Sequence, residues 1–226
     1  AGIRDSVRIV MASDLHLGYI LNKREAKRFV REINAQKGDI VLLTGDIIDR
    51  SPAPVIERNL REELSTLKAP LGVYAVPGNH EYYGDPETSI AYIESAGITL
   101  LRDSIVPVES SFYLIGRDDY YVRNRASLEQ LTDTLPDDMP RILLDHQPRD
   151  LNEAAENGIA LQLSGHTHDG QFFPVNLLVK TMYEVSHGHK QNGKTHLYVS
   201  SGLGLWNSMV RVGTRSEIVV ITLLFE

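Results

Sequence analysis

Five apolar segments of the chain end in short clusters that contain Asp, Asn or His. Apolar runs of this length, bounded by polar or turn residues, are typical of buried strands. In chain order the segments are VRIVMASDLH (7–16), DIVLLTGD (39–46), LGVYAVPGNH (71–80), RILLDHQP (141–148) and IALQLSGHTH (159–168). We therefore expect buried strands that each run into a loop with polar side chains.

The segments between these strands have the periodicity of amphipathic helices. Within residues 23–34 one helical stripe is apolar and consists of Ala26, Phe29, Val30 and Ile33. Further helices are expected over residues 54–68, 88–96 and 127–135. Strands that alternate with helices predict βαβ units with right-handed crossovers, and hence an α/β protein.

The last third of the chain, from about Thr195, is expected to be rich in strands. The run IVVITLLF (218–225) predicts a buried strand and is far too short to cross a bilayer as a helix. The sequence contains no internal repeat, low-complexity tract or linker. A chain of 226 residues is long enough for one substantial core, so we expect a single domain over residues 1–226.

The segment GHKQNGKT (188–195) matches the glycine-rich loop that binds nucleotide phosphates. That loop requires a helix after it, whereas the next residues, THLYVSSGLG, favour a strand. Asn192-Gly193 is also a strong hairpin signal. We expect a β-hairpin here, and exposed histidines rather than a third metal site at His187, His189 and His196.

Composition excludes several classes of protein. Hydrophobic residues make up 42% of the chain and charged residues 23%, which is ordinary globular usage. The formal net charge of -7 leaves no general basic surface, so stable binding of duplex nucleic acid is not expected. Because the chain has no cysteine, any metal must be held by His, Asp, Glu or Asn.

The cellular location stays open at this level. The chain contains no apolar run that could span a membrane, but it begins AGIRDSVRI without a methionine, as after removal of an upstream signal or anchor. Two locations remain: a cell membrane, reached through a segment absent from this chain, or the cytoplasm.

The polar clusters contain the side chains that bind divalent cations. In α/β sheets the carboxyl ends of the strands share one edge, so these residues are expected to lie close together. Asp14 and His16, two residues apart, are expected on one face of a strand end, and His166 and His168 repeat this spacing. The other candidates are Asp46, Asp49, Asn79, His80 and His146. Together they match the ligands of a hard or borderline divalent ion.

The five clusters SDLHLG, GDIID, GNHE, DHQP and GHTH resemble the ordered motifs of the calcineurin-like metallophosphoesterases. This resemblance implies two mixed β-sheets packed face to face with flanking helices, an α/β/β/α sandwich. The later segments LYVSSGLGLW and VRVGTRSEIVVITL further resemble the YkuE-like branch, whose members are often tethered to a membrane.

The resemblance also implies a pair of metal ions. One would be held by Asp14, His16, Asp46 and His168. The second would be held by Asp46, Asn79, His146 and His166, so Asp46 would bridge them. Histidine, aspartate and asparagine suit Mn²⁺, Fe²⁺ or Fe³⁺, and Zn²⁺, and the identity of the metals stays open.

Two ions about 3.5–4 Å apart imply direct attack of a metal-bridging water or hydroxide on phosphorus, without a covalent intermediate. His80 is expected to protonate the leaving group, and Asp49 to orient its ring. Arg50 extends GDIID as in the protein serine/threonine phosphatases, where an arginine contacts phosphate; a solvated loop arginine is an equal alternative.

The predicted function is therefore hydrolysis of a phosphomonoester or phosphodiester, on a small, membrane-linked or lipid substrate. The alternatives are a soluble phosphodiesterase for nucleotides or nucleic acid, and a nonenzymatic metal-binding scaffold, which the intact ligand set disfavours. The sequence leaves the oligomeric state open.

Three features beside the motifs have two readings each. The stretch QFFPVNLLVKTM (171–182) could form an exposed patch near a lipid surface, but we expect a core wall that joins the sheets. Asp169, where relatives commonly have glycine, could repel anions or orient Gln171. The loop 116–124 could wall the substrate pocket through Tyr120 and Tyr121, or form a polar surface turn.

Overall fold

The computed structural model describes residues 4–225. Its strands are β1 Ser6–Ala12, β2 Ile40–Thr44, β3 Val73–Val76, β4 Thr99–Leu100, β5 Ser104–Val108, β6 Phe112–Gly116, β7 Arg141–Leu144, β8 Ile159–Ser164, β9 Gly188–Asn192, β10 Thr195–Val199 and β11 Val219–Leu224. Its helices are α1 Lys23–Ala35, α2 Ala53–Glu57, α3 Arg61–Leu64, α4 Asn79–Tyr82, α5 Pro86–Ser95, α6 Leu128–Thr132, α7 Leu151–Glu156 and α8 Val175–Met182, with a 3₁₀ turn, η1, over His168–Gly170. The predicted domain includes residues 1–3 and 226, which lie outside the described part.

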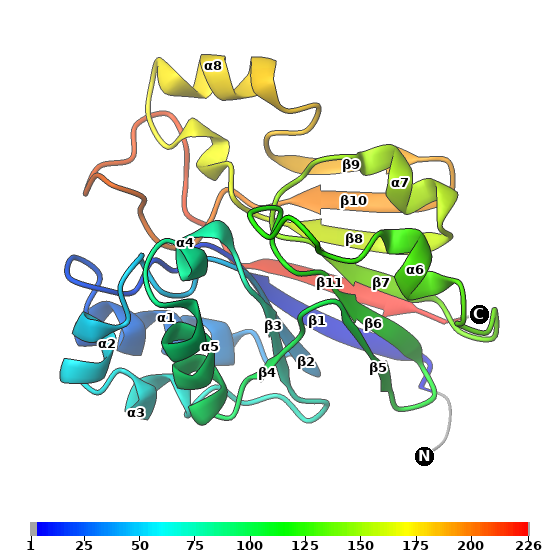
Figure 1. Ribbon diagram of the computed structural model, residues 1–226, viewed down its shortest axis with the longest axis horizontal. Helices are drawn as coiled ribbons and strands as arrows, with labels where there is room; N and C mark the ends of the chain where they lie inside the picture. The colour runs from blue at the N-terminus through cyan, green and yellow to red at the C-terminus, as the bar shows by residue number, and fades with distance from the viewer. Residues whose placement is uncertain (1–3, 226) are drawn as a thin grey trace.

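Two mixed sheets form the centre of the molecule, as predicted. One has the order β11-β1-β2-β3-β4, in which only β11 is antiparallel to its neighbour. The other has the order β5-β6-β7-β8-β10-β9, in which the outer pairs β5–β6 and β9–β10 are antiparallel. Helices α1 to α5 lie beside the first sheet, and α6 and α7 beside the second (Figure 1).

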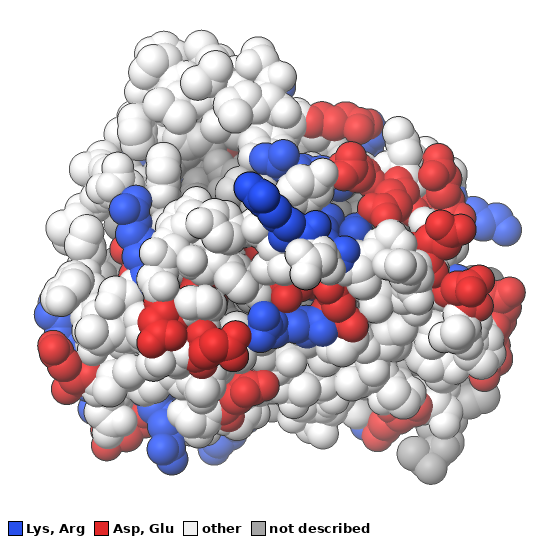
Figure 2. Space-filling model, in the orientation of Figure 1, with Lys and Arg blue, Asp and Glu red and all other residues white. Residues whose placement is uncertain are grey.

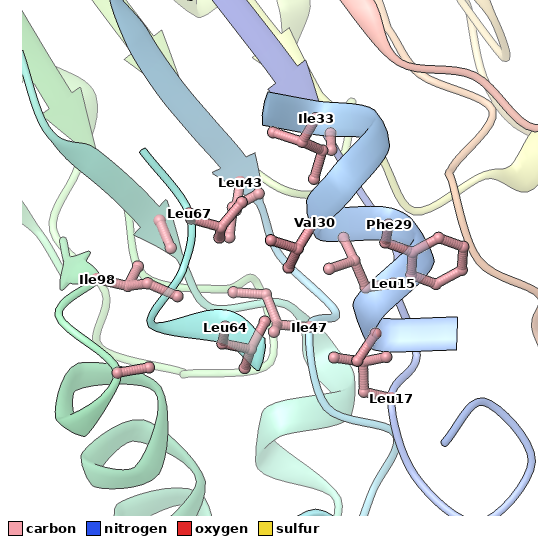
Figure 3. Close-up of a cluster of buried hydrophobic side chains, with 14 of the residues drawn as sticks. Leu15, Leu17, Phe29, Val30, Ile33, Leu43, Ile47, Leu64, Leu67 and Ile98 are labelled. Carbon is pink, nitrogen blue, oxygen red and sulfur yellow. The ribbon is translucent and has the colours of Figure 1, made fainter. Parts of the chain in front are cut away.

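Three apolar layers hold this sandwich together. Alternate residues of β1 and β2 point to opposite faces, so Ile9 and Leu42 meet Phe112 and Leu144 of the other sheet. The opposite faces of β1 and β2 pack on α1 through residues such as Leu43 and Phe29 (Figure 3). A third layer joins the second sheet to α6 and α7. The predicted α/β/β/α arrangement is therefore correct.

Helix α1 has the N-terminal cap and the apolar stripe that its sequence predicts. The side chain of Asn22, the N-cap residue, accepts a bond from the Arg24 amide at 3.0 Å. The Asn22 amide in turn donates to the Glu25 carboxylate at 3.2 Å, which completes a capping box. The predicted stripe, which includes Phe29 and Ile33, is buried. By contrast, the single helix expected over residues 54–68 is two short helices, because Asn59 at φ 50° interrupts it.

The C-terminal third contains fewer strands than expected. After Thr195 the described chain forms only β10 and β11, joined by a long loop over residues 200–218. Strand β11 lies at a sheet edge, and of its residues only Val219 is buried, so the prediction of a buried strand is wrong for most of it. The GHKQNGKT segment is the predicted hairpin, with β9 antiparallel to β10 and Gly193 at φ 61°.

Helix α8 contradicts the expectation of a core wall over residues 171–182. None of its residues is buried. It projects at the top of Figure 1, apart from both sheets. Within residues 4–225, no helix has both the length and the apolar character that a membrane span needs.

Candidate metal centre

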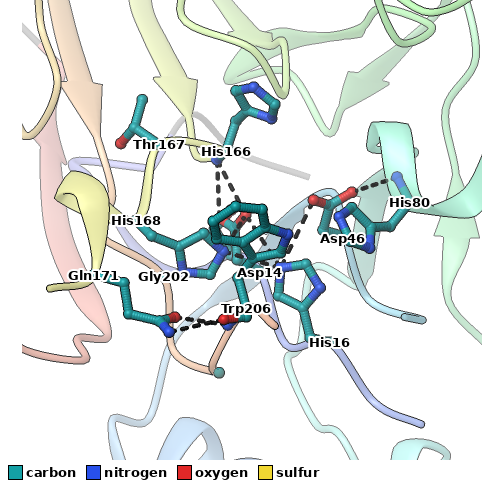
Figure 4. A network of polar contacts seen from close by, with 12 residues as sticks. Asp14, His16, Asp46, His80, His166, Thr167, His168, Gln171, Gly202 and Trp206 are labelled. Atoms are coloured by element: carbon teal, nitrogen blue, oxygen red, sulfur yellow. Dashed lines mark hydrogen bonds and ion pairs between the residues drawn. The ribbon is translucent and has the colours of Figure 1, made fainter. Parts of the chain in front are cut away.

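The polar loops predicted from the sequence meet at one edge of the sandwich. They follow β1, β2 and β3 in the first sheet, and β7 and β8 in the second. The side chains of Asp14, His16 and His168 converge there, with Asp46 beside them (Figure 4). Three overlapping groups of the described residues bring ligand atoms within 4.8 Å of one another: Asp14, His16 and His168; His16, Asp46 and His80; and Asp46, His146 and His166.

Left-handed backbone, rather than strand geometry, aims these side chains. The expectation that Asp14 and His16 share one face of a strand is wrong, because β1 ends at Ala12. Both residues lie in the following loop with φ of 54° and 47°, and Asp46 has φ of 52°. His166 and His168 share this conformation. It costs roughly 1–3 kcal/mol per residue and persists where the surroundings fix it, as at functional sites.

The first group is buried and closely packed. The Nε2 atoms of His16 and His168 lie 2.9 Å apart, and Asp14 Oδ1 lies 3.3 Å from His168 Nε2. The Asp14 carboxylate accepts bonds from Ser13 Oγ at 2.5 Å and from the His166 amide at 3.0 Å. Two imidazole nitrogens and a carboxylate oxygen thus face one point, as the ligands of a cation do.

Near the group of Asp46, His146 and His166, two buried atoms lack partners. His146 bonds the Thr44 carbonyl through Nδ1 at 2.7 Å, so its Nε2 faces Asp46 Oδ2 at 3.2 Å. Asn79 donates to the Tyr83 hydroxyl at 2.7 Å, which directs Oδ1 the other way. Within residues 4–225, His146 Nε2 and Asn79 Oδ1 have no hydrogen-bond partner. Unpaired buried polar atoms are costly, and metal ligation is one way to satisfy an imidazole nitrogen or an amide oxygen.

The ionisation of the site suits a cation. Burial disfavours a charged carboxyl, but the attraction of His146 outweighs it and holds the pKa of Asp46 well below its usual range. Burial and the charge of His146 lower the pKa of His166 to about 3. Burial also lowers the pKa of His168. The neutral imidazoles of His166 and His168, near the ionised Asp46, offer the lone pairs that a metal needs.

Glu81 positions two of the loops, and the sequence argument assigned it no role. Its buried carboxylate accepts bonds from the amides of Asp46 at 3.1 Å, Ile48 at 2.8 Å and Gly78 at 2.7 Å. Burial and the nearby charge of Asp46 raise the pKa of Glu81 to about 7. The signal was present, because a Glu three residues after a helix N-cap can accept a bond from the N-cap amide, as Glu81 does from Gly78.

Two motif glycines allow the loops to approach one another. A Cβ at Gly78 would lie 2.1 Å from Asp46 Oδ1, and one at Gly165 would lie 1.8 Å from Ser13 Oγ. A side chain at either position would therefore displace the loop that carries a candidate ligand.

Arg211 is a second residue that the sequence did not reveal. Its guanidinium group donates to the carbonyls of Ser201 at 2.8 Å, Gly202 at 3.1 Å and Gly204 at 2.9 Å. It also lies 3.3 Å from His168 Nδ1. One side chain thus holds the loop after β10 against the metal-ligand loops.

His80 and Asp49 lie together at the side of the centre. His80 Nδ1 is 2.8 Å from Asp49 Oδ1, and the His80 amide donates to Asp46 Oδ1 at 2.9 Å. Burial opposes charge on the ring, but the bond with Asp49 raises the pKa of His80. Despite partial burial, the bonds with His16 and His80 hold the pKa of Asp49 below its usual range.

A cleft of about 350 Å³ opens over these residues. Its polar side includes Asp46, Asn79, His80, His166 and His168. Arg50 also lines it, with its guanidinium carbon 5.9 Å from the centre of the Tyr83 ring. Tyr120 lines a separate cleft. The guanidinium carbons of Arg125 and Arg149 lie 4.5 and 4.8 Å from the centre of its ring.

Asp169 does not orient Gln171. Its carboxylate accepts a bond from Ser186 Oγ at 3.3 Å. Gln171 instead donates to the Trp206 carbonyl at 2.8 Å and accepts from the Trp206 amide at 2.6 Å. The histidines around the hairpin lie outside the candidate metal groups. His189 Nε2 is 3.0 Å from His196 Nδ1, and no metal-holding group among residues 4–225 includes either residue or His187.

Comparison with known proteins identifies relatives that match nearly the whole chain. An uncharacterised metallophosphoesterase of Helicobacter pylori is 36% identical over 224 residues, which are 96% of this chain and 60% of that protein. YkuE of Bacillus subtilis, an uncharacterised metallophosphoesterase, is 31% identical over 97% of this chain and 79% of its own length, which agrees with the resemblance to that branch. A Danio rerio transmembrane protein with a metallophosphoesterase domain is 33% identical over 97% of this chain and 53% of its length.

Solved structures share the fold at low identity. A 5'-nucleotidase precursor of Thermus thermophilus has a TM-score of 0.56 and 13% identity, over 97% of this chain and 54% of that one. The chain spans about 60% of the Helicobacter relatives that it matches. Residues 7–170 match the family described as calcineurin-like phosphoesterase, and together with the relatives above this match shows that the chain belongs to that family.

Proposed function

We propose that the chain is a dinuclear-metal phosphoesterase that hydrolyses a phosphomonoester or a phosphodiester. The observation that carries the proposal is the group of Asp46, His146 and His166, in which the buried His146 Nε2 lies 3.2 Å from Asp46 Oδ2 and has no hydrogen-bond partner; the buried Asn79 Oδ1, in the lining of the same cleft, also lacks one. Asp46 belongs both to the group with His16 and to the group with His146, as a bridging carboxylate would.

The ligand sets follow from this arrangement. We assign Asp14, His16, Asp46 and His168 to one ion, and Asp46, Asn79, His146 and His166 to the other, and Mn²⁺, iron and Zn²⁺ all suit these donors. When bound, two such ions lower the pKa of a water molecule between them and balance the charge of the phosphoryl oxygens. Asp14 and His146 are held in place by Ser13 and the Thr44 carbonyl, so the chain orients the ligands before an ion arrives.

His80 is the proposed proton donor to the leaving oxygen. Its ring lines the cleft, and His80 Nδ1 donates to Asp49 Oδ1 at 2.8 Å, which fixes the ring and favours its protonated form. The other nitrogen is then free to face a leaving group. Arg50, which lines the same cleft, is the proposed contact for a phosphate oxygen.

Two alternatives lead to different measurements. A soluble phosphodiesterase for nucleotides or nucleic acid fits the same centre, and the net charge of -7 argues against duplex substrates. A nonenzymatic scaffold would not need His80 and Asp49 aligned beside an intact ligand set. For location, the similarity to a Danio rerio transmembrane protein supports membrane association over the cytoplasm, and fractionation of cells tests this.

The proposal is tested by a metal screen with chromogenic substrates. Metal-free protein receives Mn²⁺, Fe²⁺ or Zn²⁺ and is assayed with p-nitrophenyl phosphate and bis-p-nitrophenyl phosphate, beside phospholipid and nucleotide substrates. We expect turnover that requires metal. Absence of hydrolysis with every metal and substrate, in a protein that binds metal, would favour the scaffold.

A further inference from the structure

The cleft over the metal centre has two chemically different sides. The candidate ligands and Arg50 form its polar side. The other side consists of uncharged residues, and they are Val175, Leu178, Val179, Met182, Tyr183 and Trp206. A ligand that fills the cleft must therefore combine an anionic group with an apolar part.

Helix α8 contributes the apolar side as one regular stripe. Val175, Leu178, Val179 and Met182 are spaced i, i+3, i+4 and i+7, the pattern with which a helix normally packs on a core. Here the stripe lines the cleft instead, and Leu178 and Met182 remain 60% and 64% exposed. An exposed apolar stripe of this kind, next to a polar site, is typical of a surface that a ligand covers.

The loop that carries Trp206 is anchored to the segment that precedes α8. Gln171, fully buried, bonds both the amide and the carbonyl of Trp206. Phe172 and Val212 also pair, through the bond from the Phe173 amide to the Val212 carbonyl at 3.1 Å. Helix α8 and the 206–212 loop are thus tied together at the metal loop rather than being independent surface features.

The distribution of charge selects the occupant. On the face shown in Figure 2, the projecting region around α8 is almost entirely white, and charged side chains gather below it. The stripe of α8 is aliphatic and suits a flexible alkyl chain, which the rings of Tyr183 and Trp206 in the same lining also accept. A nucleobase, which aromatic faces often hold, is the competing ligand that the binding test must separate. Arg50 and the metal ligands stand at one end of this apolar surface, where a phosphate head would lie.

We propose that the substrate is an amphiphilic phosphoester, whose phosphate occupies the metal centre and whose linear alkyl chain lies against the stripe of α8 and Trp206. This inference rests on the proposed function and specifies its substrate class. Leu178 and Met182 act as specificity-determining residues, because they contact the alkyl chain of the substrate without touching its phosphate.

The chain has one tryptophan, Trp206, which provides a direct binding signal. We would titrate Zn²⁺-loaded protein with linear alkylphosphonates from ethyl to decyl, below the concentrations at which they aggregate, and follow tryptophan emission. Burial of one methylene strengthens binding by up to about fourfold, so we expect Kd to fall about two- to fourfold per methylene until the stripe is covered. The emission should shift to the blue as the ring loses contact with water.

A matched pair of variants tests the residues. Leu178→Ser should flatten the dependence of Kd on chain length. Leu177→Ser changes a neighbouring leucine that is 54% exposed but lies outside the cleft, and should keep the wild-type dependence. Equal behaviour of the two variants, a Kd independent of chain length in the wild type, or tighter binding of nucleoside monophosphates than of decylphosphonate would overturn the inference.

Hydrolysis of p-nitrophenyl phosphate separates this inference from the proposed function. A protein that hydrolyses this small substrate but shows a flat alkylphosphonate series contradicts only the amphiphilic substrate. A protein that binds metal and hydrolyses none of the phosphoesters contradicts the function itself.

Discussion

The metal-ligand loops and helix α8 face the same cleft, but they are held in opposite ways. Asp14, Asp46 and His146 are buried, and each is bonded to a neighbouring loop or strand end. No residue of α8 is buried, and its apolar stripe faces the cleft. Under the proposals made above, the two sheets fix the chemistry, whereas substrate choice depends on α8, an element that can change without disturbing them.

The largest effect is expected from removal of the residue shared by both groups. Asp46→Ala removes the proposed bridge and leaves His146 Nε2 without its neighbour, so we expect loss of metal and at least about a 1,000-fold fall in kcat/KM. Elemental analysis and steady-state kinetics measure both. Asp133→Ala, at an exposed position, is the control, and an Asp46→Ala protein that retains both metals would contradict the bridging role.

A smaller loss is expected when the proposed acid is removed and the ligands stay. His80→Ala should keep both metals and reduce kcat by roughly 100-fold or more, the usual contribution of general acid catalysis. The exposed His189→Ala serves as its control. Turnover equal to the wild type would remove His80 from the mechanism, and loss of metal would make it a ligand instead.

Stability should separate the core from α8. Leu43 is fully buried between β2 and α1, so Leu43→Ala is expected to lower the free energy of unfolding by about 2–5 kcal/mol. Leu178→Ala removes an exposed side chain and should cost less than about 0.5 kcal/mol. Denaturant unfolding compares the two. A cost at Leu178 close to that at Leu43 would mean that α8 packs on the body.

The smallest effect concerns pH and the link between the hairpin and the loop before β11. His187 Nε2 lies 3.2 Å from Glu217 Oε1, and this bond raises the pKa of His187. A histidine whose pKa is raised by folding contributes stability below its unfolded pKa of about 6.5, and this contribution disappears as pH rises through the folded value. Because the pair is partly exposed, the contribution should stay below about 0.5 kcal/mol.

Thermal unfolding of the wild type and His187→Gln checks this sign. The wild type should have the higher Tm at about pH 6, and the difference should vanish by about pH 9. A difference that grows with pH would show that the pair does not stabilise the protein in this way.

The fold and the candidate ligands could be predicted because their signals are local. A buried strand followed by Asp or His is visible in a short window, and the carboxyl ends of such strands share an edge. The geometry that aims Asp14 and His16 was missed, since left-handed φ angles depend on contacts with other loops. Arg211 was also missed, because it bonds carbonyls of residues 201–204 and nothing in its own segment indicates this.

The error at α8 has a different cause. An apolar stripe at helical spacing predicts that the helix covers something apolar, but not whether that is a core or a ligand. The spacing of Val175 and Met182 fits contact with a core and contact with a ligand equally well, and only the cleft beside them distinguishes the two. The sequence analysis assigned no helix to residues 171–182, and the structure shows both the helix and the cleft that its stripe lines.

Anomalous diffraction from Mn²⁺-soaked crystals would show whether the proposed pair of ions binds. We expect two peaks about 3.5–4 Å apart, with the Asp46 carboxylate between them and His16 and His146 on opposite sides. A single peak, or none, at these side chains would contradict the proposal.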